Sequence, residues 1–445
     1  MALAVGCMLP QPLHAEESTE ATVKTKEQLQ EAIKNVNIST IRLGENISAD
    51  VVIPENRSIT LDLGGKTLTN ETSHTIYNKG VLTIDGTAGT VDNVTHAKAA
   101  LDNDGVAILN SGNFIRSKEN GINSTTSGGN SFYTIRNHGD MTINSSVSVS
   151  QNGRYSSMIE NGWQNGKENK TGTASLMEIN GGTFSGGLNT IKNDDYGVLT
   201  IYDGNFANTT QAALLNWNEA TVENGTFEST GPAVLNGGGN ATMDKGTLNL
   251  KGGTFTGAAG QDAVAAMNGQ ASYLNGVDIT GGAYSSDVSL MVAAGSSELV
   301  KASGDNRYQV GQYTSSTQGV TAATQLNNTN VFFESLNDAV KQKGVSNVNV
   351  VADATLTQPV PAGVNVTVMG NTTLTASGNL GNVSFQSGAK LVVPDGQTVT
   401  INGKQYSAGS YEAKGDGSLA KPETTPSAPA DSSTGKTNPK TGVRA

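Results

Sequence analysis

The sequence of 445 residues contains little of several residue types that define common protein classes. Its one cysteine, Cys7, permits no disulfide framework, and its four histidines lack the spacing of metal ligands, so we expect no metal and no cofactor. Charged residues make up 15% and aromatic residues 5%, which argues against a coiled coil and against a chain kept disordered by its charge. The net charge of −11 comes without clustered basic residues, so nucleic acid is not an expected partner.

Glycine, in contrast, is abundant at 54 residues, while hydrophobic residues make up only 36%. An elongated repeat protein fits this composition, because its thin core needs few apolar residues and every repeat needs turns. The length is sufficient for two or three domains.

One repeat unit is an aliphatic-rich strand followed by glycine and then an aromatic residue. Its copies are Met177–Phe184, Leu199–Phe206, Ala220–Phe227, Leu248–Phe255 and Val277–Tyr284. Because equivalent residues of a repeat protein lie above one another, we expect Phe184, Phe206, Phe227 and Phe255 to form an internal stack.

A second repeat unit is an aliphatic residue followed within one or two positions by asparagine. Its asparagines are Asn78, Asn110, Asn137, Asn161, Asn193, Asn216, Asn236 and Asn268. Asparagine tolerates the left-handed backbone of a tight turn, and its amide can hydrogen-bond the neighbouring repeat. We therefore predict a structural ladder of these asparagine side chains inside one turn.

Two interlocked repeats of roughly 20 to 30 residues are typical of a parallel β-helix, in which each strand pairs with its copy in the next coil. The predicted fold class is therefore all-β: a right-handed parallel β-helix (a solenoid) with a short N-terminal capping helix and a second, shorter cap-plus-β module. Thr25–Gln28 is a capping-box pattern, and Leu29, Ala32 and Ile33 lie on one face of the helix that follows. A similar order of helix and strands returns after Phe333 and marks the second module.

The predicted domain plan has five parts. They are a signal-peptide remnant at 1–15, the capped β-helix at 16–290, a connector at 291–330, the second cap-and-β module at 331–415 and a Pro/Ser/Thr-rich wall spacer at 416–445. Leu13–Ala15 fits the small-residue rule before a signal-peptidase cut. Ala4–Cys7 loosely resembles a lipobox, which leaves a lipoprotein as the alternative.

A pentapeptide near the C-terminus follows the spacer and resembles the LPxTG sorting signal of Gram-positive wall-anchored proteins, with asparagine in place of leucine. It consists of Asn438, Pro439, Lys440, Thr441 and Gly442. The resemblance implies that a sortase cuts after Thr441 and joins this residue to peptidoglycan.

The repeats, together with the ending Gly281–Ser289 before the next module, resemble the pectate-lyase-like β-helix surface proteins of anaerobic Gram-positive bacteria. The resemblance covers most of residues 25–415. It implies a secreted, cell-wall-anchored, extracellular protein without a membrane span in this chain. Such folds host both enzymes and adhesins, so the fold alone leaves the function open.

Catalytic constellations are incomplete. A glycoside hydrolase needs two or three converging carboxylates, and Asn193–Asp195 imitates part of such a set, but His138–Gly139 and Arg116–Lys118 precede it where the polygalacturonase-like order places them after it. A lyase needs an acidic calcium site and a basic residue, for which only Asp102 and Asp104 with Arg116 are candidates. We therefore expect no catalytic residues.

A binding surface is better supported. The segment Glu160–Gly172 looks like a loop inserted between repeats, and the residues that follow three of the ladder asparagines should gather along one edge. These ligand-binding candidates are Trp163, Asp194, Asp195, Tyr196 and Trp217. Trp and Tyr faces suit sugar rings or protein hot spots. We expect a cell-surface adhesin or binding protein that recognises a glycan or a host or microbial surface protein; the alternatives are a polysaccharide lyase or glycoside hydrolase, and a structural stalk.

Overall fold

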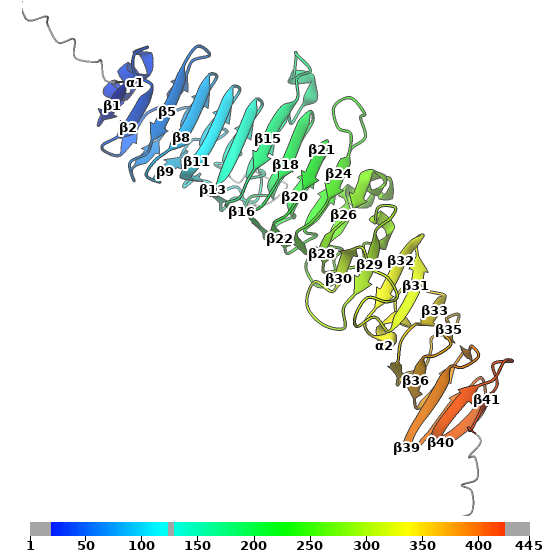
Figure 1. Ribbon diagram of the computed structural model, residues 1–445. Helices are drawn as coiled ribbons and strands as arrows, with labels where there is room; N and C mark the ends of the chain where they lie inside the picture. The colour runs from blue at the N-terminus through cyan, green and yellow to red at the C-terminus, as the bar shows by residue number, and fades with distance from the viewer. Residues whose placement is uncertain (1–18, 123–128, 423–445) are drawn as a thin grey trace, which may run out of the picture. The chain divides into compact units, whose positions relative to one another are not determined.

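The computed structural model describes residues 19–122 and 129–422 and divides the chain into two units, Met1–Ala339 and Val340–Ala445. Strands far outnumber helices in the described chain, which confirms the prediction of an all-β fold (Figure 1). The predicted signal-peptide remnant and the sorting motif lie outside the described residues. The helices of the described part are α1 (Lys26–Lys34), α2 (Leu336–Ala339) and the 3-10 turns η1 (Gly166–Glu168), η2 (Met267–Gly269), η3 (Ala271–Gly276) and η4 (Ser289–Met291). None of them is long and apolar enough to cross a membrane.

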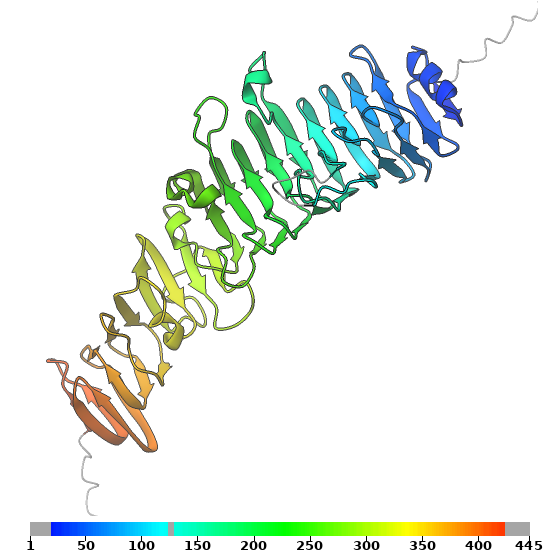
Figure 2. The same cartoon turned by 180° about the vertical axis from the view of Figure 1, so that it is seen from behind.

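The strands of the first unit fall into three rows, and each strand pairs in parallel with its copy one repeat further on (Figures 1 and 2). The first row is β1 (Glu20–Val23), β2 (Thr40–Leu43), β5 (Ser58–Asp62), β8 (Val81–Asp85), β11 (Val106–Ile115), β13 (Asp140–Gln151), β15 (Ser175–Ile179), β18 (Gly197–Ile201), β21 (Glu219–Val222), β24 (Thr247–Leu250) and β27 (Val277–Ile279). The second row is β3 (Ile47–Ser48), β6 (Thr67–Thr69), β9 (Thr90–Asp92), the ends of β11 and β13, β16 (Thr183–Gly186), β19 (Asn205–Asn208), β22 (Thr226–Ser229), β25 (Thr254–Thr256) and β28 (Gly282–Tyr284). The third row is β4 (Val51–Ile53), β7 (Ile76–Asn78), β10 (Leu101–Asn103), β12 (Ile135–Asn137), β14 (Ile159–Asn161), β17 (Asn189–Asn193), β20 (Ala212–Asn216), β23 (Val234–Asn236) and β26 (Val264–Ala266).

Alternation along the strands decides which side chains are buried. In β5, Ile59 and Leu61 are buried while the residues beside them are not, and in register they meet Leu82 and Ile84 of β8. Because successive side chains of a strand point to opposite faces, this two-residue period gives each strand one aliphatic face. Burial of each such side chain contributes roughly 1.5–3 kcal/mol. The N-terminal end is covered by α1, which begins after the capping side chain of Thr25 and packs against β1 and β2.

The predicted aromatic stack is confirmed. Neighbouring rings along Phe184, Phe206, Phe227, Phe255 and Tyr284 lie 4.6 to 5.0 Å apart and within 11° of parallel. A glycine with positive φ stands two residues before each of them; at Gly204 a Cβ atom would come within 3.0 Å of the Phe206 ring. The Gly-x-aromatic pattern therefore reflects a steric requirement, because each of these glycines has a positive φ and an added Cβ atom would come within 3.1 Å of the following ring or of the preceding repeat's backbone.

A ladder of buried asparagine side chains runs along the ends of the third-row strands. Each amide nitrogen donates to the amide oxygen of the next asparagine at 2.7 to 2.9 Å, in the order Asn78, Asn103, Asn137, Asn161, Asn193, Asn216, Asn236. All seven are fully buried. Each amide from Asn103 to Asn216 also donates to backbone carbonyls of its own or the next repeats, so the polar groups of this interior turn are satisfied.

Two predicted ladder members, Asn110 and Asn268, lie outside this ladder. Asn103 takes the place expected for Asn110, which accepts instead from Asn144 at 2.7 Å in a second, more exposed row with Asn180. At the C-terminal end the residue in register with Asn236 is Ala266, and Asn268 lies two residues later in a turn with φ +54°. Both asparagines follow the expected local pattern, but strand register, which local sequence does not determine, places them elsewhere.

Beyond Tyr284 the pairing of the first unit becomes partly antiparallel. The stretch predicted as a connector holds β29 (Ser297–Val300), β30 (Tyr308–Gly311), β31 (Ala322–Leu326) and β32 (Thr329–Phe333). The second unit contains the parallel strands β33 (Asn347–Val350), β35 (Asn365–Val368) and β38 (Val383–Phe385), the parallel strands β34 (Ala354–Leu356), β36 (Thr373–Ala376), β37 (Gly378–Gly381) and β39 (Lys390–Ile401), and the antiparallel strands β40 (Lys404–Ala413) and β41 (Leu419–Ala420).

The ladder makes a stability prediction. In Asn193→Asp a carboxylate would replace an amide that donates to Asn216 Oδ1, Gly197 O and Glu219 O, so a buried charge would face three acceptors. We expect a loss of more than about 3 kcal/mol, measured as a fall in melting temperature by calorimetry. The matched control is Asn180→Asp in the exposed row, which should cost less than about 1 kcal/mol. Equal losses in the two variants would show that the buried amide is not what stabilises the repeats.

Candidate functional site

The outward face of the third row carries a line of chemically unlike residues. The next-to-last residue of each strand there points outward, and these residues lie in register: Val52, Tyr77, Asp102, Arg136, Glu160, Lys192, Leu215, Leu235 and Ala265. Acidic and basic residues alternate from Asp102 to Lys192, and aliphatic residues follow. Opposite charges placed directly across parallel strands stabilise the pairing, and they also provide a polar platform on a rigid sheet.

Asp102 is held between Arg136 and His74. Arg136 binds it through two parallel hydrogen bonds of 2.7 Å, and His74 Nε2 lies 3.3 Å from its other side. The amide of Ala99 donates to His74 Nδ1, so the proton of the neutral ring is on Nε2 and points to the carboxylate. Burial lowers the pKa of His74 to about 4, which keeps this ring neutral at pH 7. Both oxygens of Asp102 are thus engaged by basic side chains.

Glu160 is the most unusual ionisable group of this face. It is 1% exposed, its Oε1 has no hydrogen-bond partner among the described residues, and Tyr133 hydrogen-bonds its carboxyl group. Burial, helped by the neighbouring Asp194 carboxylate, raises the pKa of Glu160 to about 8. The group is therefore largely protonated at pH 7. Asp194, which is 3% exposed, forms an ion pair with Lys192.

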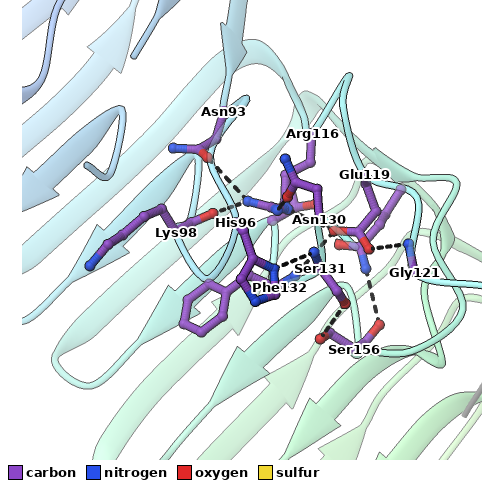
Figure 3. Close-up of polar contacts among 12 residues, drawn as sticks. Asn93, His96, Lys98, Arg116, Glu119, Gly121, Asn130, Ser131, Phe132 and Ser156 are labelled. Atoms are coloured by element: carbon purple, nitrogen blue, oxygen red, sulfur yellow. Dashed lines mark hydrogen bonds and ion pairs between the residues drawn. The ribbon is translucent and has the colours of Figure 1, made fainter. Parts of the chain in front are cut away.

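The described residues that follow β11 contain a buried ion pair between Arg116 and Glu119 (Figure 3). Arg116 Nε lies 3.0 Å from Glu119 Oε2, and both side chains are inaccessible to solvent. Glu119 also accepts from the Phe132 amide, while Ser131 donates from its amide to His96. These contacts place Phe132 over the Arg136 guanidinium at 5.4 Å and bring the neighbouring Tyr133 beside Glu160. Phe132 and Tyr133 thus add aromatic groups to an outward line whose own aromatic residue is Tyr77.

A groove of about 480 Å³ opens beside this platform. Aromatic, amide, hydroxyl and aliphatic side chains and one lysine line it: Tyr133, Tyr155, Ser156, Ser157, Gln164, Leu188, Asn189, Lys192, Gln211, Leu215, Trp217 and Met267. Asn189 Nδ2 donates to Gln211 Oε1 at 2.8 Å, which fixes both amides and leaves Gln211 Nε2 as a donor on the groove wall. Aromatic rings beside oriented amides are the combination that recognises a partly apolar, hydroxyl-rich ligand.

Trp217 is fixed from behind by a glycine. A Cβ atom on Gly237 would come within 2.9 Å of Trp217 Cε3, so the backbone of Gly237 lies directly against the indole. Tyr273 meets the indole edge-on with ring centres 6.1 Å apart, and the Trp217 amide donates to Asn193 O at 2.7 Å. The ring is therefore held in place by packing before any ligand arrives.

A second hollow, of about 460 Å³, lies beside Trp163. Here the indole stacks on the His138 ring, with centres 3.8 Å apart and planes within 5°. Asp104 accepts from Tyr77 at 2.5 Å and lies 3.2 Å from His138 Nδ1. Asp104, Asp140, Thr171 and Thr173 also line this hollow.

The five predicted ligand-binding residues therefore do not form one site. Trp217 lines the groove and Trp163 lines the second hollow, whereas Asp194, Asp195 and Tyr196 line neither. Asp195 instead anchors the 163–174 loop, because its carboxylate accepts from Gly166 and its carbonyl accepts from Trp163. Tyr196 has φ +62° and bonds Met243 through its backbone amide.

The residues examined as catalytic sets do not converge either. Asn193 belongs to the ladder, Arg116 pairs with Glu119 rather than with Asp102 or Asp104, and the two aspartates have separate partners. Sequence analysis missed most of the groove, including Tyr133, Tyr155, Asn189, Lys192 and Gln211. Only the outward position of successive third-row strands could have indicated Lys192, and from Val52 to Lys192 that position holds a different residue type in every strand.

Comparison with protein-family models, with curated protein sequences and with solved structures gives no match to this chain.

The buried Glu160 carboxyl should make stability depend on pH. Its folded-state pKa of about 8 lies above the ordinary value of 4.5, so between these pH values the folded chain holds a proton that the unfolded chain has released. The free energy of unfolding should therefore fall as the pH rises from about 5 to 8. Glu160→Gln should remove this loss, so that its melting temperature exceeds that of the wild type increasingly towards pH 8.

The control for this experiment is Glu178→Gln, because the Glu178 side chain is exposed on β15. Its melting temperature, measured by calorimetry in the same buffers, should follow the wild-type profile. Parallel profiles for wild type and Glu160→Gln would mean that Glu160 is ionised throughout this range.

Proposed function

We propose that the protein is a cell-surface glycan-binding protein that holds its ligand in the Trp217 groove without chemically altering it. The observation that carries the proposal is the groove itself, where the Tyr133, Tyr155 and Trp217 rings lie around the amides of Asn189 and Gln211. A sugar ring has an apolar C–H face and a rim of hydroxyl groups. The aromatic rings can stack on the face, and the amides and Lys192 can hydrogen-bond the rim.

The rigidity of the groove supports the proposal. Asn189 and Gln211 hydrogen-bond each other, and Trp217 is packed against Gly237. Asn189 belongs to β17, while Gln211 directly precedes β20 and Trp217 directly follows it. A binding site that is already formed loses little side-chain entropy when the ligand arrives. Polar groups arranged in this way give specificity for the hydroxyl pattern of a particular sugar.

We propose further that the three parallel rows are the faces of a right-handed parallel β-helix of the pectate-lyase-like kind. Support comes from the register between repeats, the aromatic stack and the asparagine ladder. Secretion and anchoring to peptidoglycan by a sortase through Asn438–Gly442 complete the proposal, supported by the Pro/Ser/Thr-rich spacer before that motif. The glycan would belong to a host or microbial surface, and the long repeat unit would present the groove to it.

A glycoside hydrolase is the second candidate, because Glu160 is a carboxyl group with a pKa of about 8 beside the ionised Asp194. One protonated and one ionised carboxyl group are what an acid–base pair requires. However, Glu160 is 1% and Asp194 3% exposed, and neither lines the groove. Binding without turnover therefore accounts for the geometry better.

The test is binding of the purified full chain to an array of neutral glycans (xylan, mannan, arabinan, β-glucan) and acidic glycans (polygalacturonate, hyaluronate, heparan sulfate). Trp217→Ala should weaken the strongest binding by at least about tenfold, equivalent to about 1.4 kcal/mol. The control is Tyr202→Ala, which removes a ring that is 46% exposed and lines neither hollow, and which should change nothing. Absence of wild-type binding to every glycan would reject the proposal and favour a structural stalk.

Gly237→Ala offers a sharper version of the same test. The backbone at Gly237 does not have positive φ, so alanine fits the chain, but its methyl group would push on the Trp217 indole from 2.9 Å. We expect glycan binding to weaken at least about fivefold although every groove side chain is retained. Unchanged affinity would mean that the position of the Trp217 ring does not matter for binding.

Incubation of the bound glycan with the wild type, followed by measurement of new reducing ends, separates the two candidate functions. No release is expected. Release that disappears in Glu160→Gln would establish the hydrolase instead.

A further inference from the structure

We propose that the hollow beside Trp163 is a second sugar-binding subsite, selective for neutral sugars, and that it and the Trp217 groove together bind one glycan polymer. This inference depends on the proposed glycan-binding function. The residues around Trp163, which do not line the groove, would then also bind sugar. The ligand would be a neutral chain long enough to cover both hollows.

Two stacked aromatic rings line the second hollow. The indole of Trp163 and the imidazole of His138 lie parallel at 3.8 Å and line the same hollow. The buried Trp163 Nε1 has no hydrogen-bond partner among the described residues. That nitrogen is inaccessible to solvent, so Trp163 offers a sugar the apolar surface of its ring rather than its N–H group.

The second hollow also carries two carboxylate side chains. Asp104 and Asp140 line the hollow, and Asp140 is exposed at the start of β13. Asp104 is engaged by Tyr77 and His138, yet each carboxylate oxygen can accept more than one hydrogen bond. Carboxylates accept hydrogen bonds from sugar hydroxyls readily, whereas they repel uronate and sulfate groups. The hollow therefore suits neutral sugars and excludes acidic ones.

One loop forms a wall of both hollows. Trp163, Thr171 and Thr173 line the second hollow, and Gln164, the residue next to Trp163, lines the groove. The 163–174 loop is thus common to both. Asp195 fixes this loop through the amides of Trp163 and Gly166, each at 2.9 Å. Two rigid subsites with a common wall can be occupied by successive parts of one chain.

Two joined subsites have a measurable consequence. A disaccharide can occupy only one of them, whereas a polymer that covers both gains the second contact as an intramolecular step, which typically adds about 10²-fold or more in affinity. Affinity should therefore rise steeply with chain length. Trp163→Ala should remove most of that rise and leave disaccharide affinity unchanged.

The experiment measures affinity by calorimetry for xylan, mannan and β-glucan and for oligosaccharides of two to ten sugars cut from each. Trp163→Ala should bind the best of these polymers at least about tenfold more weakly than wild type does. Asp140→Ala alters an exposed side chain and keeps the loop intact, so it should also weaken polymer binding, by about threefold or more. Tyr202→Ala is the control, as before.

The outcomes separate this inference from the proposed function. If the wild type binds no glycan, both are rejected. If Trp217→Ala loses binding while Trp163→Ala and Asp140→Ala match the wild type on polymers, only the second subsite is rejected. Equal weakening of disaccharide and polymer by Trp163→Ala would mean a single joint site, and strong binding of polygalacturonate that depends on Trp163 would refute the selectivity for neutral sugars.

Discussion

The parallel register between successive repeats is the constraint on which the rest of the first unit depends. It places like residues directly above like, about 4.8 Å apart, so a residue that suits its neighbours in one repeat suits them in all. A buried amide such as Asn193 then finds its acceptor on Asn216 and serves as acceptor for Asn161. A buried ring such as Phe206 stacks on the equivalent ring of the repeat before it and of the repeat after it. Each buried amide or ring therefore has the equivalent residue of the next repeat as its partner, and no separate partner is needed for each group.

Repetition in the interior leaves the outward positions free to differ. Along the third row the inward residues are aliphatic or asparagine, while the outward ones change from Asp102 through Lys192 to Leu215. The hydrogen bonds and packing between repeats come from the inward residues. The outward residues can therefore differ from repeat to repeat and serve in recognition. The charged segment, the groove and the second hollow all lie on this variable face or at its edge.

This division also explains how far sequence analysis could go. Buried positions recur with a period that is visible along the chain, so the strands, the aromatic stack and six of the seven ladder asparagines could be predicted. Asn103 fits the aliphatic-x-Asn pattern through Leu101, but Asn110, which follows two aliphatic residues directly, fits it too, and local sequence could not choose between them. The groove could not be predicted either, because it combines one outward position per repeat with Tyr133, which depends on the long-range docking of the Arg116–Glu119 loop.

The asparagine ladder has a direction. Every amide nitrogen from Asn78 to Asn216 donates towards the C-terminus, and at Asn236 the donor turns to the carbonyls of Gly246 and Tyr273 because alanine follows in register. A whole repeat inserted between Asn78 and Asn236 would receive one hydrogen bond and pass one on, so it would leave no amide unmatched. The same insertion beyond Ala266 would find no chain of amides to join. Gene duplication can therefore lengthen this unit from within but not from its C-terminal end, and the number of repeats is open to evolution where the ladder is continuous.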